Sequence, residues 1–396
     1  MRRAAICVKL ILILGKGCID MSEYKAASFF AGVGGIDIGF EKAGFETVYA
    51  NEFDSYAADT FECNFEKIKV DRRDIHIVST DEIPEFDILL AGFPCQAFSI
   101  AGYRQGFDDE KGRGELFFEL IRIMEVKRPR IAFFENVKNL VGHDNGNTFK
   151  VIREQLDILG YKYVYQVMNA CEYGNIPQNR ERIYIVAFRD EEDFDNFTMP
   201  LSVPLERTIR DVIAFGVEQD EKYYYTEKKC NFYKDLVRDM KCSNTIYQWR
   251  RVYVRENKSN MVPTLTANMG TGGHNVPLIL TDDGRIRKLT PRECFNVQGF
   301  PKDFILPEQS NGRLYKQAGN SVVVPVVERI AESIRIAIDK TDSNMHFKKV
   351  DELIQKGEER FAKLIVELNR FDRNGDIMKA AVDVTYRNVL FSEFGL

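Results

Sequence analysis

Histidine, tryptophan and paired cysteines are scarce in this chain. Its 396 residues include four histidines and one tryptophan. The eight cysteines contain no CxxC pair and follow no regular spacing, a pattern that fits neither a disulfide framework nor a zinc site. We therefore predict no metal site and a reducing, cytoplasmic location.

A long hydrophobic run is also missing. The N-terminal stretch MRRAAICVKLILILG is interrupted by Lys9, is too short to span a bilayer, and lacks a clear small-residue cleavage site. We interpret residues 1–20 as a dispensable leader before an ordered domain that starts at Met21, with a membrane-targeting role as the alternative. No membrane partner is predicted.

No sign of charge dominates. The chain has 55 Lys and Arg against 60 Asp and Glu, which gives a formal net charge of −5. This balance provides no global basic field, so any binding to nucleic acid must come from a local patch. With 29% charged and 44% hydrophobic residues, the composition is that of an ordinary globular protein, long enough for two domains.

What the chain does contain is a regular alternation of apolar runs and helical patterns. This alternation over residues 24–188 predicts an α/β domain with a doubly wound, mostly parallel sheet. The expected strands are 24–30, 46–51, 86–92, 130–136 and 182–188, and the expected helices are 36–44, 55–65 and 116–127.

The alternation stops near residue 189. Residues 189–286 carry clusters of Tyr, Asn, Lys and Gly with few amphipathic helices, and regular patterning returns after them with a helix expected over 326–338. We therefore predict five parts: a leader (1–20), the α/β domain (21–188), a smaller irregular domain (189–286), a segment that completes the α/β domain (287–340), and a helical extension (341–396).

A glycine loop follows the first expected strand in FFAGVGGIDIGF, residues 29–40. Gly32, Gly34 and Gly35 let the backbone approach a ligand at the carboxyl end of that strand, where α/β sheets bind cofactors. Glu52 stands at the end of the next expected strand, 18 residues after Gly34, where it can accept hydrogen bonds from ribose hydroxyls. The pattern fits a dinucleotide or another adenosine cofactor such as S-adenosylmethionine.

A lone thiol follows another strand end in AGFPCQAFSIAG, residues 91–102. Cys95 lies in a loop after Pro94, where a packing cysteine is not needed and a nucleophilic thiolate is useful. Glu135 ends the expected strand 130–136 and can serve as an acid. Arg180 and Arg182, two residues apart at the start of another strand, can stabilise negative charge.

A basic patch lies in the irregular domain. Residues 228–258 hold nine Lys or Arg and three acids, a local balance of +6, interleaved with aromatic residues. The following residues, 259–275, carry no charge, and their Gly, Asn, Thr and His could enter a DNA groove and read base edges.

Together these segments resemble the DNA cytosine-5 methyltransferases of bacterial restriction-modification systems. FAGVGG, NEFD, GFPCQAFS, FENV, QNRER and GNSVVVPV occur in that family's order over about residues 24–338. The resemblance implies a Rossmann-like methyltransferase fold and methyl transfer from S-adenosylmethionine to C5 of cytosine in double-stranded DNA, with base flipping. It also makes the irregular domain a target-recognition domain, short enough for a single short site.

The resemblance further implies roles for individual residues. Cys95 would add to C6 of cytosine, Glu135 would hold and protonate N3, and Arg182, with Arg180, would steady the base and the thiolate. The S-adenosylmethionine pocket would be lined by Phe30, Gly32, Gly34, Glu52, Phe53, Asp74, Ile75, Pro94, Leu116, Asn320 and Val322. DNA contacts are expected at Arg250, Arg251, Arg255, Thr264, Leu265, Gly272 and Gly273. We expect the protein to be a monomer. We also expect a cognate restriction endonuclease that acts on the same DNA site, with no direct contact between the two proteins implied.

Two positions depart from the family pattern. Ser28 stands where the family usually has an aspartate, which leaves one cofactor-side contact open, and Arg73 replaces a glycine. An RNA cytosine methyltransferase and, more remotely, a nicotinamide-dependent oxidoreductase are the alternatives. The oxidoreductase leaves Cys95 and Glu135 unexplained.

Overall fold

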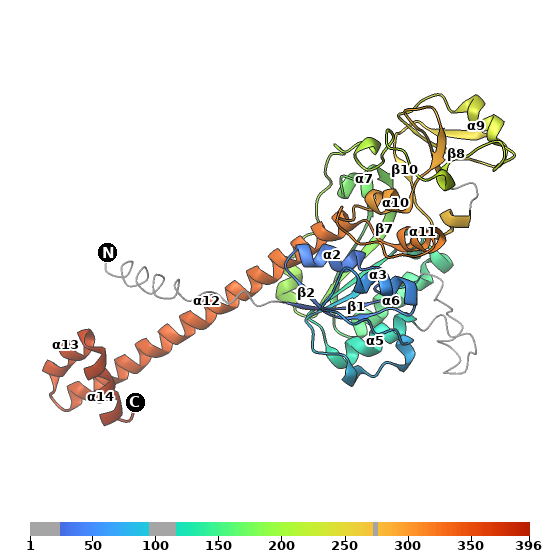
Figure 1. The fold of residues 1–396 in the computed structure, drawn as a ribbon. Coiled ribbons are helices and arrows are strands. Elements are labelled where there is room, and N and C mark those ends of the chain that lie inside the picture. The colour runs from blue at the N-terminus through green and yellow to red at the C-terminus, as the bar shows by residue number, and fades with distance from the viewer. Residues whose placement is uncertain (1–23, 95–115, 272–275) are drawn as a thin grey trace. The chain divides into compact units, whose positions relative to one another are not determined.

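The protein is described by a computed structural model that covers residues 24–94, 116–271 and 276–396. The chain divides into two compact units after Arg335. The first unit holds all the sheets, and the second, residues 336–396, is helical (Figure 1).

A six-stranded sheet forms the centre of the first unit. Its order is β2 (Glu46–Asn51), β1 (Lys25–Phe29), β3 (Ile88–Ala91), β4 (Ile131–Val137), β7 (Glu181–Phe188) and β5 (Lys162–Asn169). The pairs within β2-β1-β3-β4 are parallel, whereas β7 runs antiparallel to both β4 and β5. This mixed, mostly parallel sheet confirms the predicted fold class. The sequence predicted five of these strands and missed β5.

The direction of β7 matters for the site. The parallel strands β1 to β4 bring their carboxyl ends to one edge of the sheet, and the antiparallel β7 brings its first residues there. In the register of this pair, Arg182 lies opposite Val137, and Tyr184 lies opposite Glu135. Because β5 ends beside the start of β7, with Asn169 opposite Glu181, one strand start and five strand ends meet at this edge.

Helices and short 3-10 turns cover the sheet. The helices are α2 (Gly35–Lys42), α3 (Ser55–Glu62), α5 (Leu116–Lys127), α6 (Asn147–Ile158), α7 (Ala170–Tyr173) and α8 (Glu191–Asn196). The helix predicted over 116–127 is confirmed, and α5 buries Phe117, Leu120 and Ile123 against the sheet. The 3-10 turns of this part are η1 (Ile75–Ile77), η2 (Thr80–Glu82), η4 (Lys138–Val141) and η5 (His143–Gly146). Three more, η6 (Ile209–Asp211), η7 (Glu221–Tyr223) and η8 (Ala267–Thr271), pack in a separate hydrophobic cluster.

A small sheet occupies the region that the sequence described only as irregular. Its order is β12 (Ile286–Lys288), β11 (Pro277–Leu280), β8 (Ile246–Trp249) and β9 (Val254–Asn257), all antiparallel. Helix α9 (Tyr233–Asp239) packs on it, and Phe232 stacks on Trp249 with ring centroids 4.6 Å apart. The aromatic residues of the basic patch thus build a core as well as a surface.

Two short strands join this region to the central sheet. In β6 (Gln178–Asn179) and β10 (Val262–Pro263), Val262 pairs with Gln178 and Pro263 pairs with Asn179. The chain then forms α10 (Pro291–Val297), α11 (Asn311–Asn320) and the start of α12 (Val324–Arg370), and α10 and α11 pack beside the glycine loop. Thr290 and Glu293 form a capping box at the start of α10.

The second unit has its own small core. Helices α13 (Asn374–Val382) and α14 (Val384–Glu393) enclose Leu364 and Leu368 of α12, together with Ala380, Leu390 and Phe391. Across the residues that the structure describes, no helix combines the length and the apolar character needed to cross a membrane.

Candidate active site

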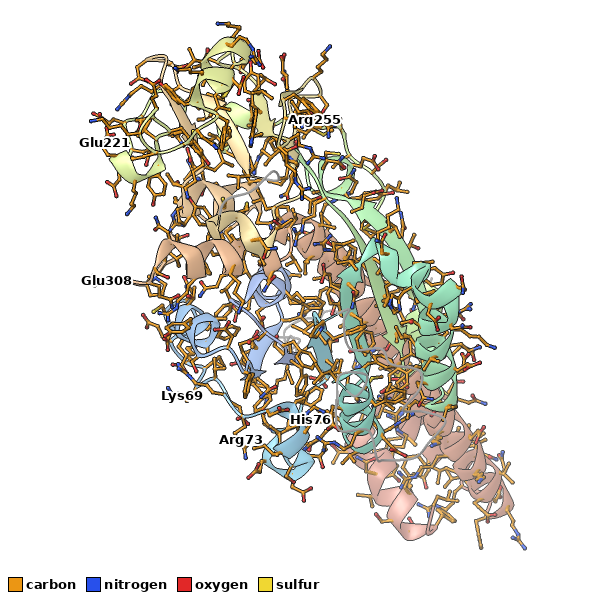
Figure 2. The ribbon with its side chains drawn as sticks, turned by 90° about the vertical axis from the view of Figure 1, so that its right-hand side faces the viewer. Lys69, Arg73, His76, Glu221, Arg255 and Glu308 are labelled. Atoms are coloured by element: carbon orange, nitrogen blue, oxygen red, sulfur yellow. The ribbon has the colours of Figure 1, made fainter. Side chains whose placement is uncertain are left out.

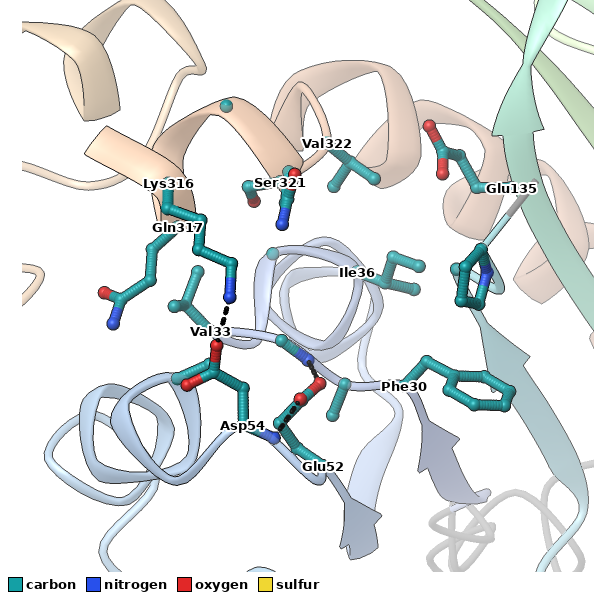
Figure 3. Close-up of a pocket in the computed structure, with 18 of the residues that line it drawn as sticks. Phe30, Val33, Ile36, Glu52, Asp54, Glu135, Lys316, Gln317, Ser321 and Val322 are labelled. Atoms are coloured by element: carbon teal, nitrogen blue, oxygen red, sulfur yellow. Dashed lines mark hydrogen bonds and ion pairs between the residues drawn. The ribbon is translucent and has the colours of Figure 1, made fainter. Parts of the chain in front are cut away.

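The glycine loop forms one side of a pocket of about 920 Å³ (Figure 3). Gly32 and Gly34 have φ angles of 58° and 84°, in the left-handed region that glycine tolerates best. A side chain at Gly34 would also collide with the ring of Phe65, which lies 2.3 Å from the position of a Cβ atom. At Gly32 the same position is open, with nothing within 4 Å. The loop therefore exposes its backbone to the pocket at Gly32.

Glu52 fixes the loop from the neighbouring strand. Its Oε2 accepts a hydrogen bond from the Gly32 N–H at 2.8 Å, and its Oε1 accepts one from the Asp54 N–H, also at 2.8 Å (Figure 3). Burial raises the pKa of the Glu52 carboxyl, and these two backbone donors oppose the rise. Because a carboxylate oxygen can accept more than one hydrogen bond, Glu52 can still receive donors from a ligand.

Helix α11 and the residues after it form the opposite wall. Lys316 reaches across to Asp54 with an ion pair of 2.7 Å, drawn in Figure 3. Asn320 and Val322 both line the pocket, as predicted from the sequence, and Ser321 between them lines it too. The wall comes from residues almost 300 positions after the glycine loop, so long-range folding completes the pocket.

Glu135 and Arg182 face the pocket from the centre of the sheet. The Arg182 Nε lies 3.0 Å from Glu135 Oε1, and their side chains are only 15% and 11% exposed. Burial raises the pKa of Glu135, although the positive charges of Arg182 and Arg180 oppose it. A carboxyl with a raised pKa beside a guanidinium can donate a proton and also hold a planar polar group. Figure 3 shows Glu135 and Glu52 on opposite sides of the pocket.

The segment leading to the predicted nucleophile lines the same pocket. Gly92, Phe93 and Pro94 are all lining residues, and a Cβ atom at Gly92 would lie 3.7 Å from Glu135 Oε2. Asn136, which is buried, donates its side-chain amide to the Phe93 carbonyl at 2.9 Å. Cys95 itself lies outside the described residues. The described chain stops at Pro94, one residue before Cys95, and this segment lines the same pocket as Glu135.

Asn136 was missed by the sequence reasoning. It stands next to Glu135 in the quoted FENV motif, and it ties the end of β4 to the segment before Cys95. The available signal was the polar residue at a strand end, but only the fold shows that its partner is the carbonyl of Phe93.

The remaining predicted pocket residues have mixed placements. Phe30 lines the pocket, and Phe53 lies between two lining residues with 70% of its surface exposed. Asp74 caps the η1 turn, where it contacts the His76 ring and N–H, and Ile75 packs in the main core. Leu116 packs against the same core at the start of α5. Asp74, Ile75 and Leu116 are not among the residues that line the pocket.

The structure does not support a direct catalytic role for Arg180. Its side chain is 2% exposed, is not part of the pocket lining, and donates hydrogen bonds to three backbone carbonyls. The two-residue spacing suggested that Arg180 and Arg182 share a face. Arg180 lies between β6 and β7, and its positive charge still acts on Glu135, whose pKa it lowers, so its role in catalysis stays a prediction.

A second pocket, of about 370 Å³, lies where the small sheet meets β6 and β10. It is polar and is lined by Asn179, Gln248, Arg250, Arg255, Asn257, Ser259, Pro263, Thr264 and Thr266. Arg255 lies in the small-sheet region in Figure 2. Within the described parts of the chain, its guanidinium forms no hydrogen bond or ion pair, which leaves it available to a ligand. Thr264 donates to the Asn179 carbonyl at 2.6 Å.

The other predicted DNA contacts are placed as follows. Arg251 is exposed in the turn between β8 and β9, with a φ angle of 73°. Leu265 is 1% exposed, so its side chain is a core residue, and its expected contact with DNA stays a prediction. Gly272 and Gly273 lie outside the described residues.

Comparison with known proteins identifies the family. A family model for C-5 cytosine-specific DNA methylase matches residues 24–335. The chain belongs to the C-5 cytosine-specific DNA methylase family. This DNA cytosine-5 methyltransferase is 63% identical over 312 residues to the Type II methyltransferase M.Bsp6I of Bacillus sp. (strain RFL6), an alignment covering 78% of the chain and 98% of that protein.

A second relative agrees with this assignment, and a solved structure matches the fold. The methyltransferase is 39% identical to M.HhaI of Haemophilus parahaemolyticus over 80% of the chain and 95% of that protein. Its fold matches a DNMT2 structure of Spodoptera frugiperda with a TM-score of 0.59 and 20% identity, over 78% of this chain and 99% of that one. At that identity, the match to DNMT2 supports the fold alone.

Proposed function

We propose that this methyltransferase takes its methyl group from S-adenosylmethionine and transfers it, through a covalent Cys95–C6 adduct, to a cytosine flipped out of a short site in double-stranded DNA. One observation carries the proposal. A single pocket is lined both by the glycine loop with Glu52 and by Glu135, Arg182 and the segment before Cys95.

The residues of the pocket suit S-adenosylmethionine. Glu52 has spare acceptor capacity for the two ribose hydroxyls, and the open backbone at Gly32 allows close approach of the ligand. Phe30, Pro94, Asn320 and Val322 supply further proposed contacts from the pocket wall. Phe53, Asp74, Ile75 and Leu116 stay proposed contacts, although none of them lines the pocket. When bound, the cofactor supplies an electrophilic methyl group on a sulfonium.

The chain's own groups act on the base. The Cys95 thiolate adds to C6, and its electron pair forms the S–C6 bond while the ring electrons shift toward N3. Glu135, whose pKa is raised by its burial, donates a proton to N3, and Arg182 holds the carboxylate that remains. C5 thereby becomes nucleophilic enough to be methylated. A water molecule then takes the C5 proton, the electron pair of that C–H bond expels the Cys95 thiolate from C6, and the N3 proton returns to the Glu135 carboxylate, which restores the neutral aromatic ring.

The second pocket is the proposed DNA-reading surface. Arg250 and Arg255 suit phosphate or guanine contacts, and Gln248 and Thr264 suit base edges. The target base must leave the duplex to reach a buried pocket, as base-modifying enzymes require. We further propose a monomer that acts in the cytoplasm, protecting the site of a cognate restriction endonuclease.

Covalent trapping tests the mechanism. A duplex with 5-fluorocytosine at the target should form a complex that survives denaturation, because fluorine cannot leave from C5 as a proton does. Cys95→Ser should abolish both this complex and the transfer of labelled methyl groups, while DNA binding remains. Turnover retained by Cys95→Ser, or methylation of transfer RNA in preference to duplex DNA, would contradict the proposal.

A further inference from the structure

Arg180 forms hydrogen bonds to both of the segments that lie between the two pockets. Its Nη1 donates to the Leu265 carbonyl at 2.9 Å, and its Nη2 donates to the carbonyls of Gly319 at 3.0 Å and Ser321 at 2.5 Å. Gly319 and Ser321 stand at the carboxyl end of α11, where the last carbonyls have no partner within the helix. A cation at this end is also favoured by the helix dipole. Arg180 therefore caps α11 and binds the segment after β10 at the same time.

The two segments that Arg180 joins are packed backbone to backbone. A Cβ atom added at Gly319 would lie 2.3 Å from the carbonyl carbon of Thr266 and 2.4 Å from the Ala267 nitrogen. Only glycine allows this approach. Gln178 adds a second link, since its side chain bonds Gln298, which in turn donates to the Ala318 carbonyl at 2.7 Å.

The packed contact between residues 262–267 and residues 319–322, called the seam below, separates the two pockets. Thr264 and Thr266 line the second pocket on one side, whereas Gly319, Asn320, Ser321 and Val322 line the main pocket on the other. A shift of either segment must break an Arg180 hydrogen bond or move the other segment with it. The seam is too tightly packed for the two sides to move independently.

We propose that Arg180 is a positioning residue that couples DNA reading in the second pocket to cofactor binding in the main pocket. The inference rests on the proposed assignment of DNA and S-adenosylmethionine to those pockets. A ligand that orders the 319–322 side lowers the cost of ordering the 262–267 side, and the reverse holds equally. By thermodynamic linkage, each ligand then tightens the other by the same factor.

Binding of a short target duplex, measured with and without S-adenosylhomocysteine, gives this coupling factor directly. In the wild type we expect a factor in the range of about 5 to 150 that is typical of coupled sites. Arg180→Lys keeps the charge but cannot span three carbonyls, so the factor should fall toward one. Gly319→Ala should also lower the coupling factor, because the added methyl group would push the backbone at Thr266 and Ala267 away from α11.

Arg287→Lys is the matched control. Arg287 is also fully buried and donates to the Ala214 and Lys288 carbonyls, and it forms an ion pair with Glu293, but it borders neither pocket. This variant should lose stability while keeping the wild-type coupling factor. A coupling factor in Arg180→Lys equal to that of the wild type would overturn the inference, even with methyl transfer intact. Absence of methyl transfer to DNA by the wild type would instead refute the proposed function.

A measurement on the wild type covers the case in which the variants do not fold. S-adenosylhomocysteine alone should slow hydrogen exchange of the Val262 and Leu265 amides, which bond the Pro177 carbonyl and the Gln178 side chain. Within the described residues, the amides that pair β8 with β9 make no hydrogen bond to residues 319–322 and should be unaffected. Unchanged exchange at Val262 and Leu265 with the ligand bound would contradict the coupling.

Discussion

Asp37 should make the stability of this protein depend on pH. Its side chain, in the first turn of α2, is fully buried, and its carboxylate accepts hydrogen bonds from Ser28 at 3.0 Å and Thr47 at 3.4 Å. Among the described residues, no cation forms an ion pair with it. Burial therefore raises the pKa of Asp37 from 3.8 to about 7, although the hydroxyl donors oppose the rise.

The sign and size of the effect follow from this pKa. The pKa of Asp37 is higher in the folded state than in the unfolded state. Its contribution to the free energy of unfolding is therefore complete below pH 3.8 and is lost as the pH rises to 7. Three pH units at about 1.4 kcal/mol each give a total loss of roughly 4 kcal/mol. Between pH 5 and pH 8 roughly 3 kcal/mol of this is lost. Asp37→Asn keeps the shape and stays neutral, so it should not show this loss.

Urea unfolding of the wild type and of Asp37→Asn at pH 5 and pH 8 measures the difference. The stability of the variant relative to the wild type should rise by roughly 3 kcal/mol between these pH values. Comparing the two proteins cancels the titration of Glu52 and Glu135. Ser28→Ala should move the loss to higher pH, because Ser28 lowers the pKa of Asp37. Asp195→Asn, at an exposed position, is the control, and parallel curves for Asp37→Asn and the wild type would refute the reasoning.

Two more predictions concern the pockets. Glu135→Gln should lower kcat by about 10² to 10⁴ while S-adenosylhomocysteine still binds, which stopped-flow kinetics would measure. In the wild type, a pH profile should show kcat/KM falling as pH rises through the raised pKa of Glu135. An unchanged kcat in the variant would exclude Glu135 as the proton donor. Arg255→Ala should weaken DNA binding and reduce the slope of log K against log salt concentration by about one. Arg238→Ala should change neither, because Asp235 and Asp239 already neutralise Arg238. Equal slopes for the two variants would show that Arg255 does not contact DNA.

The sequence predicted the strand ends well because apolar runs and glycine turns are local signals. Glu52, Glu135 and Pro94 were each placed at the end of a strand, and parallel pairing then brings such ends to one edge. Arg182 reaches the same edge for a different reason. It begins a strand that runs antiparallel, and no periodicity in the sequence states the direction of a strand.

The sequence could not predict contacts that depend on distant backbone atoms. Arg180 and Arg182 look alike in QNRER, but one bonds three carbonyls and the other pairs with Glu135. Leu265 likewise matched a recognition motif, yet its side chain is buried. The small sheet was missed because its strands are only three or four residues long, too short to show a period.

Ser28 shows how a departure from a family pattern can mislead when it is interpreted by position alone. In the sequence, a serine in place of an aspartate left a contact to the cofactor open. In the fold, Ser28 is buried, is not part of the main pocket lining, and donates to Asp37 on the next helix. A carboxyl group is therefore still present behind the glycine loop, but it comes from α2 and is held by two hydroxyls. The serine at position 28 therefore affects how firmly α2 is fixed to the sheet at a given pH, and not how the ligand is held. The urea unfolding curves of Asp37→Asn and Ser28→Ala would measure this effect.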